Sequence, residues 1–570
     1  MRMRYPVLWT VLLTALTAGA LSLLGQDASA APDQVFYNGK IITVDSAFRI
    51  QQAFAVKAGR FTAVGGNNEV RALAGKQTRL VDLGGRAVIP GLMDNHNHQY
   101  RAASTLLRGL AMADVGSVRE MLDRIRKAAA SAKPGETLYA TGGWRPETFP
   151  EKRPPTRQEL DEVSAGHPVI AFRGRGEAYA NSAALKGLGI TAKTEKFAES
   201  AVPKDSSGEP TGALAGSGNG LLDATAKLIP PPDREEKKQL ILKMQKQQNA
   251  LGLTSIRELE LSPEIMRVYT DLWHEGKLTM RVSMGLEGNL AEPEAVEAVL
   301  KGWGVGPGFG NDWLMLDTVA ELGIDGQFEN AYLRAPFADP PGNFMGLIRT
   351  TPEKVRQTLS IINRYGWRPS IHTMGDKALD VILDGYEAVD KESSIRDKRW
   401  VVEHIPIVHA DQMDRLARLG VLVSAQAQPY SVGNRMLKAW GTERANGAVP
   451  MRELLDHHLS VSSGTDWPAF TSNPFINIYF FVTRNTADAG TLGAGQKISR
   501  EEALRVTTIN NAYLTFQEKL KGSIETGKVA DFLILPQDIL TMPGEQIRDM
   551  RPVATYVDGK KVFSGPGADL

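Results

Sequence analysis

The middle of the chain alternates short apolar segments with longer helix-like ones, and this alternation constrains the fold more than any other feature of the sequence. Apolar runs end at His372, His404 and Gln426, with helix-like stretches over 376–390 and 411–419 between them. Strands that alternate with helices form parallel sheets, because each helix returns the chain to the starting edge of the sheet. The extent of the pattern predicts an α/β fold of the closed (β/α)8 barrel type, similar to the TIM barrel.

Both ends of the chain carry a different pattern. Residues 31–88 and 518–570 contain short β-branched and aromatic runs, broken by Asn-Gly, Ala-Gly and Asp-Gly pairs that are typical of hairpin turns. We therefore expect one small β-sandwich domain assembled from both termini. The barrel, over residues 89–517, is then inserted between its two halves.

The first thirty residues resemble a secretory signal peptide. Arg2 and Arg4 precede an apolar run over residues 5–25, and small residues follow up to Ala30. This order predicts cleavage after Ala30 and export to the periplasm or the exterior, with no membrane attachment afterwards. An uncleaved anchor is the alternative, because the apolar run approaches the ~20 residues that span a bilayer.

Charge and cysteine content exclude several classes of protein. The formal net charge is +1 and no acidic or basic block dominates any stretch, so nucleic acid is not expected as a partner. The chain has no cysteine, which excludes disulfides and thiolate ligands. Any bound metal must be held by His, Asp, Glu or a modified Lys.

Histidines mark the ends of several expected strands. His96 and His98 close an apolar run, and alternate residues of a strand face the same way, so both imidazoles can reach one ion. His372, His404 and Asp466 each follow another apolar run. The carboxyl ends of barrel strands meet at one edge, where catalytic groups collect. The other five histidines lie in loop-like or helix-like surroundings and are expected to be structural.

With these motifs the sequence resembles the metal-dependent amidohydrolase superfamily, and within it the amidohydrolase-3 branch. The resemblance extends over nearly all of the chain after residue 30. It rests on the segments 89–98, 208–213, 252–255, 372–376, 403–404, 464–468 and 527–532.

The resemblance implies a site for two divalent metal ions, with zinc as the first choice. His96, His98 and Asp466 would hold the more buried ion, and His372 with His404 the more exposed one. Relatives usually bridge the two ions with a carboxylated lysine, four residues before an Asp-Gly pair.

In this chain the position four residues before Asp325-Gly326 is Glu321. Its carboxylate can bridge two cations, so we expect Glu321 to be the bridging ligand. Asp317, four residues earlier on the same strand face, is the alternative. A slip of one residue in the match would place Ala320 at the bridging position instead.

The activity that the resemblance implies is hydrolysis of an amide or other C–N bond, such as a carbamate or cyclic imide, by a metal-activated hydroxide. Asp466 would accept the proton and return it to the leaving nitrogen. The substrate would be a small molecule, and a homo-oligomer is possible in principle. Two alternatives stay open: a heterocycle deaminase, and a secreted binding protein with a vestigial metal site.

An insertion is expected between the first and the fourth strand of the barrel. His98 and Glu321 are 223 residues apart, whereas three βα units need only about 100. The excess is expected within residues 130–250, over the barrel mouth, where it would shape substrate choice. Candidate substrate-binding residues there are Trp144, Arg173 and Arg175, with Arg145 and Phe149 nearby. Relatives commonly carry Asp-Gly-His where this chain has Gly174-Arg175-Gly176, so a pocket histidine is missing, and Arg173 or Arg175 could instead bind an acidic substrate group. Core packing is the alternative for Trp144 and Phe149, and a surface position for the arginines.

Overall fold

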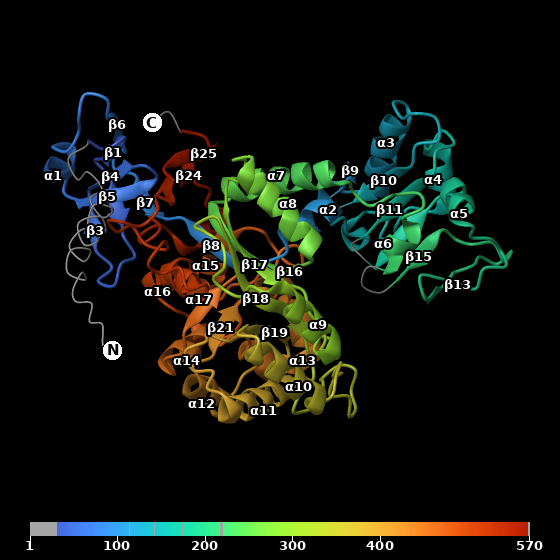
Figure 1. Cartoon of the computed structure of the whole chain (residues 1–570). Helices are drawn as coiled ribbons and strands as arrows, with labels where there is room; N and C mark the ends of the chain where they lie inside the picture. The colour runs from blue at the N-terminus through green and yellow to red at the C-terminus, as the bar shows by residue number, and fades with distance from the viewer. Residues whose placement is uncertain (1–30, 113, 142, 174–175, 217–219, 568–570) are drawn as a thin grey trace, which may run out of the picture.

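The structure is a computed structural model that describes residues 31–567 except 113, 142, 174–175 and 217–219. The expected signal peptide, residues 1–30, and the candidate Arg175 lie outside the described residues. Figure 1 shows a barrel at the centre, a small β domain that combines the blue and red ends of the chain, and a teal lobe on the far side.

Eight parallel strands form the central sheet, and the (β/α)8 prediction is confirmed. In spatial order they are β8 (Leu92–Asn97), β16 (Leu253–Leu261), β17 (Arg281–Leu286), β18 (Leu314–Gly323), β19 (Pro369–Thr373), β20 (Val401–His404), β21 (Leu422–Ala425) and β22 (Val461–Ser463). The last strand returns to the first: the Asp466 N–H donates to the His96 carbonyl at 2.8 Å, and Asn97 pairs with Trp467. This junction closes the barrel.

Helices cover the outside of the barrel. They are α2 (Gln99–Leu106), α7 (Arg234–Ala250), α8 (Pro263–His274), α9 (Pro293–Trp303), α10 (Pro352–Arg364), α11 (Asp376–Glu392), α12 (Ala410–Leu419), α13 (Gln428–Asn446), α14 (Met451–Asp456), α15 (Pro474–Thr483), α16 (Arg500–Thr507) and α17 (Ile509–Leu514). Local signals set their starts: the Thr351 hydroxyl accepts from the Lys354 N–H with Pro352 in the first turn, and Ser262 caps α8 in the same way. None of the described helices is both long and apolar enough to span a bilayer.

The small β domain is built from both ends of the chain. One sheet contains β1 (Gln34–Tyr37), β4 (Ala53–Lys57), β5 (Arg60–Gly65) and β6 (Arg79–Asp82), beside α1 (Asn67–Arg71). The other contains β2 (Lys40–Ile42), β3 (Ile50–Gln51), β7 (Ala87–Pro90), β23 (Phe532–Leu535), β24 (Ala554–Val557) and β25 (Lys560–Ser564). Between the sheets, Phe532 stacks on Tyr556 at 4.5 Å and meets Phe36 and Phe54 edge-on. Residues nearly 500 positions apart in sequence thus share one aromatic core.

The lobe is a separate α/β unit between α2 and α7. Its sheet has the order β15 (Ala213–Ala215), β12 (Glu177–Ala180), β11 (Val169–Phe172), β10 (Leu138–Thr141) and β9 (Leu110–Ala111). The described part of the lobe also contains four α-helices and a hairpin: α3 (Val118–Ala129), α4 (Arg157–Val163), α5 (Ser182–Leu188), α6 (Gly220–Thr225), β13 (Lys196–Phe197) and β14 (Ser200–Ala201).

The bounds of the lobe differ from the expected 130–250. The lobe starts at β9, twenty residues earlier, and α7 lies outside it, against α2 and α8 of the barrel. The length of the segment revealed that extra structure exists, but only the packing of α7 shows which helix belongs to the barrel.

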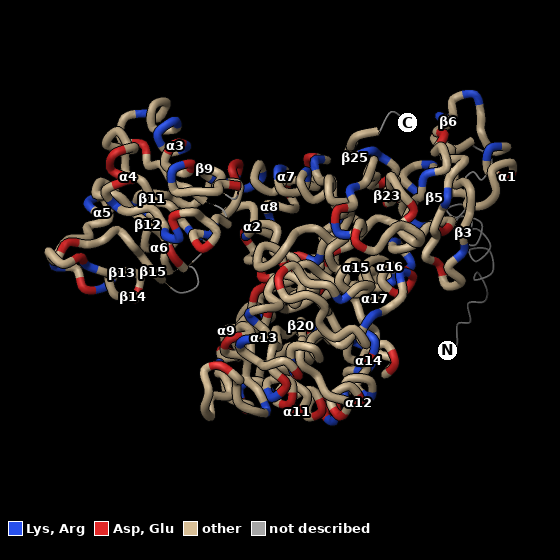
Figure 2. The backbone as a smooth tube through the Cα atoms, turned by 180° about the vertical axis from the view of Figure 1, so that it is seen from behind, with Lys and Arg blue, Asp and Glu red and all other residues tan. Residues whose placement is uncertain are grey.

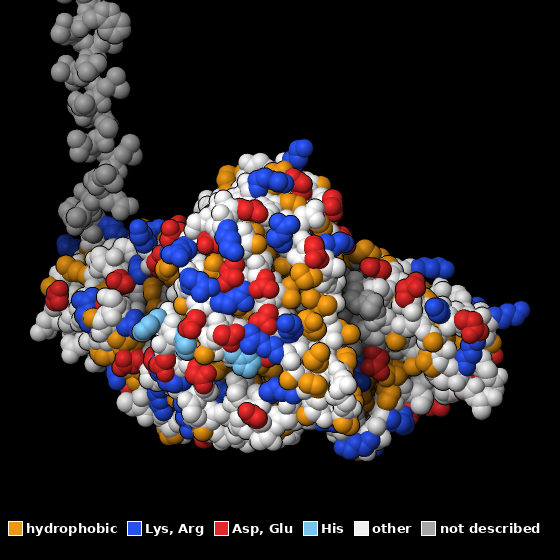
Figure 3. Space-filling model, turned by 90° about the horizontal axis from the view of Figure 1, so that it is seen from below, with side chains coloured by type: hydrophobic (Ala, Val, Ile, Leu, Met, Phe, Trp, Pro, Cys, Tyr) orange, Lys and Arg blue, Asp and Glu red, His pale blue; other side chains and the backbone are white. Residues whose placement is uncertain are grey.

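Charged residues of both signs are interspersed along the chain in all three parts (Figure 2). The outer surface of the barrel carries the same mixture when seen from below (Figure 3). This distribution follows from the nearly balanced composition of 66 basic and 65 acidic residues.

One buried cation beneath the barrel, Lys521, forms no ion pair with any residue that the structure describes. Lys521 is 2% exposed and donates from Nζ to the Ser255 hydroxyl at 2.9 Å. Burial, reinforced by the positive charge of Arg281, lowers the pKa of Lys521 to about 7.

Replacing this amine should therefore stabilise the protein in a pH-dependent way. The unfolded chain binds a proton up to the ordinary pKa of 10.5, whereas the folded chain loses it above about 7, so folding carries the full penalty of a buried amine below pH 7. Lys521→Met should raise Tm most near pH 6, and the gain should shrink as the pH approaches 9. Lys76→Met, at an exposed position, serves as the control. A gain that is constant with pH would refute the lowered pKa.

Candidate metal centre and active site

The six expected ligands lie together at one edge of the barrel. Each comes from the carboxyl end of a strand or the residues just after it: β8 and the residue that follows it supply two, β18, β19 and β20 one each, and the turn after β22 the last. They are His96, His98, Glu321, His372, His404 and Asp466, and all but Glu321 are at least 94% buried. Two of the six residues have backbone angles in the left-handed region: φ is +70° for His404 and +55° for Asp466. Non-glycine residues adopt this conformation mainly where surrounding contacts enforce it.

The Glu321 carboxylate lies between two pairs of imidazoles. Its Oε1 is 3.0 Å from His372 Nδ1 and 2.9 Å from His404 Nε2. Its Oε2 is 3.6 Å from the Nε2 atoms of both His96 and His98. One carboxylate therefore faces all four rings, each oxygen toward one pair. The structure brings Glu321 to the position where the sequence predicted a bridging ligand.

The alternatives to Glu321 do not reach this position. Asp317 lies deeper in the barrel, where its carboxylate accepts hydrogen bonds from Arg257 and Arg368. Ala320 is buried and offers no donor atom.

Asp466 completes the set on the side of the two β8 histidines. Its Oδ1 is 3.5 Å from His96 Nε2 and 3.6 Å from His98 Nε2. Two trios have donor atoms close enough to share an ion: His96, His98 and Asp466, and His96, Glu321 and His404. The first trio matches the expected buried site. His372 contacts Glu321 but does not enter the second trio in this geometry.

Outer hydrogen bonds orient three of the rings. His96 Nδ1 is 2.7 Å from Glu403, His404 Nδ1 is 2.8 Å from the Gln426 amide oxygen, and His372 Nε2 is 3.0 Å from the Gly326 carbonyl. A ring nitrogen that donates outward leaves the other nitrogen unprotonated and directed into the centre.

The donor set fits divalent metal ions. His96 Nε2 and both ring nitrogens of His98 are buried without a hydrogen-bond partner among the described atoms. Unpaired buried polar atoms are costly, and imidazole nitrogens beside carboxylate oxygens are ligands that zinc prefers.

Electrostatics in the centre couple the rings to the carboxylates. Burial alone would lower the pKa of His96, but Glu321, Glu403 and Asp466 raise it well above its ordinary value. Burial alone would raise the pKa of Glu321, but His96 and His372 hold it well below its usual range. Metal ions that bind here must therefore displace protons from the rings.

A chain of four buried charged residues, here called the charge ladder, anchors His96 to the barrel interior. Arg257 donates to Glu403 Oε1 and to Asp317 Oδ2, both at 2.6 Å, and Arg368 also donates to Asp317. All four ladder residues are at most 2% exposed. Sequence reasoning assigned Glu403 no role, although it directly precedes His404, and it missed Arg257, which lies two residues after the 252–255 motif.

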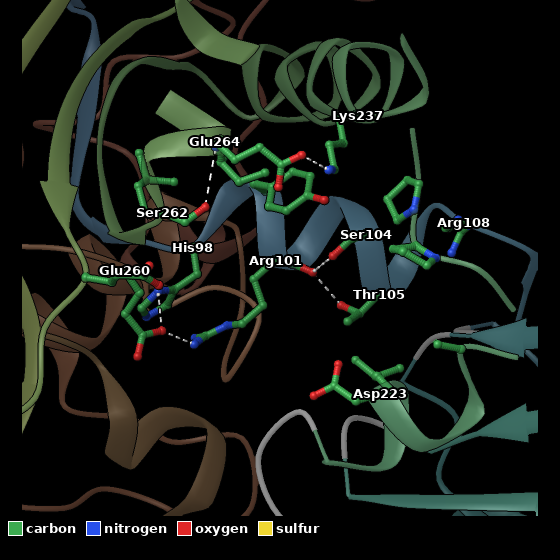
Figure 4. A pocket seen from close by; sticks show the side chains of 18 of the residues that line it. His98, Arg101, Ser104, Thr105, Arg108, Asp223, Lys237, Glu260, Ser262 and Glu264 are labelled. Atoms are coloured by element: carbon green, nitrogen blue, oxygen red, sulfur yellow. Dashed lines mark hydrogen bonds and ion pairs between the residues drawn. The ribbon is translucent and has the colours of Figure 1, made fainter. Parts of the chain in front are cut away.

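Next to His98 lies a cavity of about 610 Å³, between the barrel mouth and the lobe. Figure 4 shows side chains from α2 and from the turn after β16 around it, with His98 at one end. The lobe supplies further walls from β10, β11 and α6. A volume of this size accommodates a small organic molecule.

Three of the residues considered for substrate binding, Trp144, Phe149 and Arg173, do not line this cavity. Trp144 is 1% exposed and Phe149 is fully buried; the two rings pack together in the lobe core, and Trp144 Nε1 donates to the Phe172 carbonyl. Arg173 pairs with Glu147 and Glu177. The proposed substrate role of Trp144 is therefore wrong in this geometry, because packing within the lobe uses its whole surface.

Comparisons with known proteins agree with this geometry. The family described as "Amidohydrolase family" matches residues 79–563. The N-substituted formamide deformylase of Arthrobacter pascens is 27% identical over 94% of this chain and 99% of its own. Protein LONG AFTER FAR-RED 3 of Arabidopsis thaliana is 29% identical over 98% of this chain and 96% of its own. An uncharacterised metal-dependent hydrolase from Pyrococcus horikoshii has a similar fold, with a TM-score of 0.72 at 23% identity, over 90% of this chain and 99% of its own.

Removing the outer partner of His96 should weaken metal binding. Glu403→Gln keeps the shape of the side chain but loses the charge that fixes the ring, so metal affinity should fall roughly 10- to 100-fold. Competition with a chromophoric chelator measures the affinity. Glu162→Gln, at an exposed position of α4, should bind metal like the wild type. Equal metal affinity in the two variants would show that Glu403 does not support the metal site.

Gly464 should not tolerate a side chain. A Cβ at this position would lie 2.4 Å from the His96 backbone nitrogen, at the junction of β8 and β22. Gly464→Ala should therefore lower both Tm and metal content, by displacing His96. Gly302→Ala, in α9 with open space around it, should be neutral or slightly stabilising. Thermal unfolding and elemental analysis compare the two variants.

Proposed function

The chain belongs to the amidohydrolase family and is a hydrolase of non-peptide carbon–nitrogen bonds, and from this premise we propose that it cleaves an amide, carbamate or cyclic imide with two divalent metal ions, zinc by first choice. The observation that carries the proposal is the Glu321 carboxylate, with one oxygen toward His372 and His404 and the other toward His96 and His98. The deformylase relative, named for an N-substituted formamide, supports an amide as substrate.

The ligands would divide between two ions. His96, His98 and Asp466 would hold one ion, His372 and His404 the other, and Glu321 would bridge them. Such ions, when bound, lower the pKa of a water molecule toward ~7 and polarise a carbonyl group.

Asp466 would move the proton. Burial would raise its pKa, but the adjacent His96 and His98 rings lower it, so its carboxylate is ionised at neutral pH. Its oxygens can therefore accept a proton from the attacking water and deliver it to the leaving nitrogen. A neutral amine then leaves instead of an unstable amide anion.

Substitution of Asp466 tests this role. Asp466→Asn should lower kcat about 10²- to 10⁴-fold on an N-substituted formamide, because the amide cannot accept the proton. Metal content should be measured on the same sample, since Asp466 is also a proposed ligand. A metal-loaded Asp466→Asn variant with wild-type kcat would remove the proton-transfer role.

Two measurements separate this proposal from its alternatives. A deaminase would release ammonia from a ring carbon, whereas amide hydrolysis releases a carboxylic acid. A binding protein with a vestigial site should purify with well below one metal ion per chain and hydrolyse none of the substrates. Stripping the metal should abolish activity, and full activity without metal would end the two-ion proposal.

We also propose that the protein is exported, after cleavage at Ala30. Support comes from the sequence of residues 1–30 alone. N-terminal sequencing of the protein from its native host tests this proposal: an intact Met1 on the mature chain would contradict it.

A further inference from the structure

His98 is the one histidine of the centre whose ring forms no hydrogen bond with any described residue. Neither of its ring nitrogens has a partner there, whereas His96, His372 and His404 each have an outer hydrogen bond. The orientation of the His98 ring therefore depends on the backbone that carries it. His98 directly precedes α2, and Figure 4 shows it beside the start of that helix.

The side chain of His98 does not cap α2. The residue at this position usually accepts a hydrogen bond from the first turn of the helix, because the first backbone N–H groups of a helix have no partner inside it. The His98 side chain forms no such bond, since its Nε2 is directed into the metal centre, 3.6 Å from Glu321. The first turn of α2 therefore needs an acceptor from another element.

Glu258, from the neighbouring strand β16, provides this acceptor. Its Oε2 accepts from the Gln99 N–H, and its Oε1 accepts from the Tyr100 N–H at 2.8 Å. Each oxygen thus binds one of the two residues that follow His98. Glu258 is 1% exposed at the wall of the cavity, so water competes little for these two bonds.

Irregular strand pairing surrounds Glu258. β16 pairs with β8 so that Glu258 lies beside Asn97, and the register of this pair shifts between Ile256 and Glu258. On the other side, the register with β17 shifts between Glu258 and Leu261. Irregularities of this kind redirect a side chain from the regular alternation of a strand. They account for a carboxylate that is directed at the start of a neighbouring helix.

Other buried contacts hold the same part of the backbone. Gln99 is fully buried; its Oε1 accepts from the Tyr269 hydroxyl at 2.9 Å, and its Nε2 donates to Gln248. The His98 N–H donates to the Trp467 carbonyl at 3.0 Å, in the turn that closes the barrel. The backbone is therefore constrained on both sides of the His98 side chain.

Glu260, two residues farther along β16, does not give the same support. Its Oε2 is 3.4 Å from His98 Nδ1 without forming a hydrogen bond, and the same oxygen accepts from Arg101. The Glu260 side chain is 40% exposed, so solvent weakens its contacts. A buried group with two backbone hydrogen bonds constrains His98 more firmly.

We propose that Glu258 is a positioning residue for the metal centre, which holds His98 in place through the backbone at the start of α2. This inference rests on the two-ion site proposed above and adds a residue that supports one of the two ions. His98 belongs to the trio with His96 and Asp466. The two histidines of β19 and β20 have no contact with this helix start. Loss of Glu258 should therefore weaken the binding of one ion and spare the other.

Metal titration of Glu258→Gln tests this selectivity. The variant keeps the shape of the side chain but offers one acceptor oxygen instead of two, and its NH2 group opposes one of the two backbone N–H groups. Competition with a chromophoric chelator should show one Zn2+ ion bound roughly 10- to 100-fold more weakly than in the wild type, and the other bound as before. Glu258→Asp, which keeps a carboxylate at a shorter reach, should recover part of the affinity.

The matched control is Glu159→Gln. Glu159 accepts from the Thr156 N–H at 2.8 Å, at the start of α4 in the lobe, so this variant also removes a backbone acceptor from a helix start. The control should lower Tm and bind both ions like the wild type. If Glu258→Gln also lowers Tm but keeps the wild-type affinity for both ions, Glu258 supports the helix alone and the positioning role is overturned.

Hydrogen exchange of the metal-free, full-length protein separates this inference from the proposed function. In Glu258→Gln, the amides of residues 99–100 should exchange roughly 10-fold faster than in the wild type, because one of them loses its acceptor. If the wild type binds two ions and exchange at these residues is unchanged in the variant, the positioning role is overturned and the two-ion proposal stands. If the wild type binds no metal but the variant exchanges faster, the two-ion proposal fails and Glu258 still holds the start of α2.

Discussion

The structure of the site depends on one carboxylate surrounded by four imidazoles. Glu321 projects from β18, and its two oxygens face rings from β8 on one side and from β19 and β20 on the other. Strands this far apart in sequence can present their ends to a common point only if the sheet closes. Closure occurs where the turn after β22 hydrogen-bonds to β8, and that turn also carries Asp466. The contacts that close the barrel therefore also bring the proposed ligands together.

The charge ladder extends the site into the barrel interior. His96 contacts Glu403, which meets Arg257, which meets Asp317 and through it Arg368. Each buried charge has an opposite partner, as a low-dielectric interior requires. The ladder fixes the His96 ring by hydrogen bonds as well as by packing. It also explains why Asp317, a carboxylate on the same strand face as Glu321, is committed to two arginines rather than to the centre.

The lobe contributes to the site as a wall. Its aromatic residues Trp144 and Phe149 form the core of the lobe, and its contribution to the cavity comes from β10, β11 and α6. The lining of the cavity is thereby divided between two parts of the molecule. The barrel mouth, through Arg101 and Glu260, presents charge close to the ligands, and the lobe presents mainly apolar surface farther away.

The sequence by itself predicted the barrel and four candidate histidine ligands with Asp466, because strand–helix alternation and ligand-type residues at strand ends are local patterns. The resemblance to the amidohydrolase family added Glu321 as the expected bridging ligand, four residues before Asp325. Only the tertiary structure decided between Glu321 and Asp317, since both lie on one face of β18 and differ in depth alone. It also decided that Trp144 is a core residue, that α7 belongs to the barrel, and that Arg101 and Glu403 adjoin the site. Those roles depend on which strands become neighbours, and spacing along the chain carries no information about neighbours across a closed sheet.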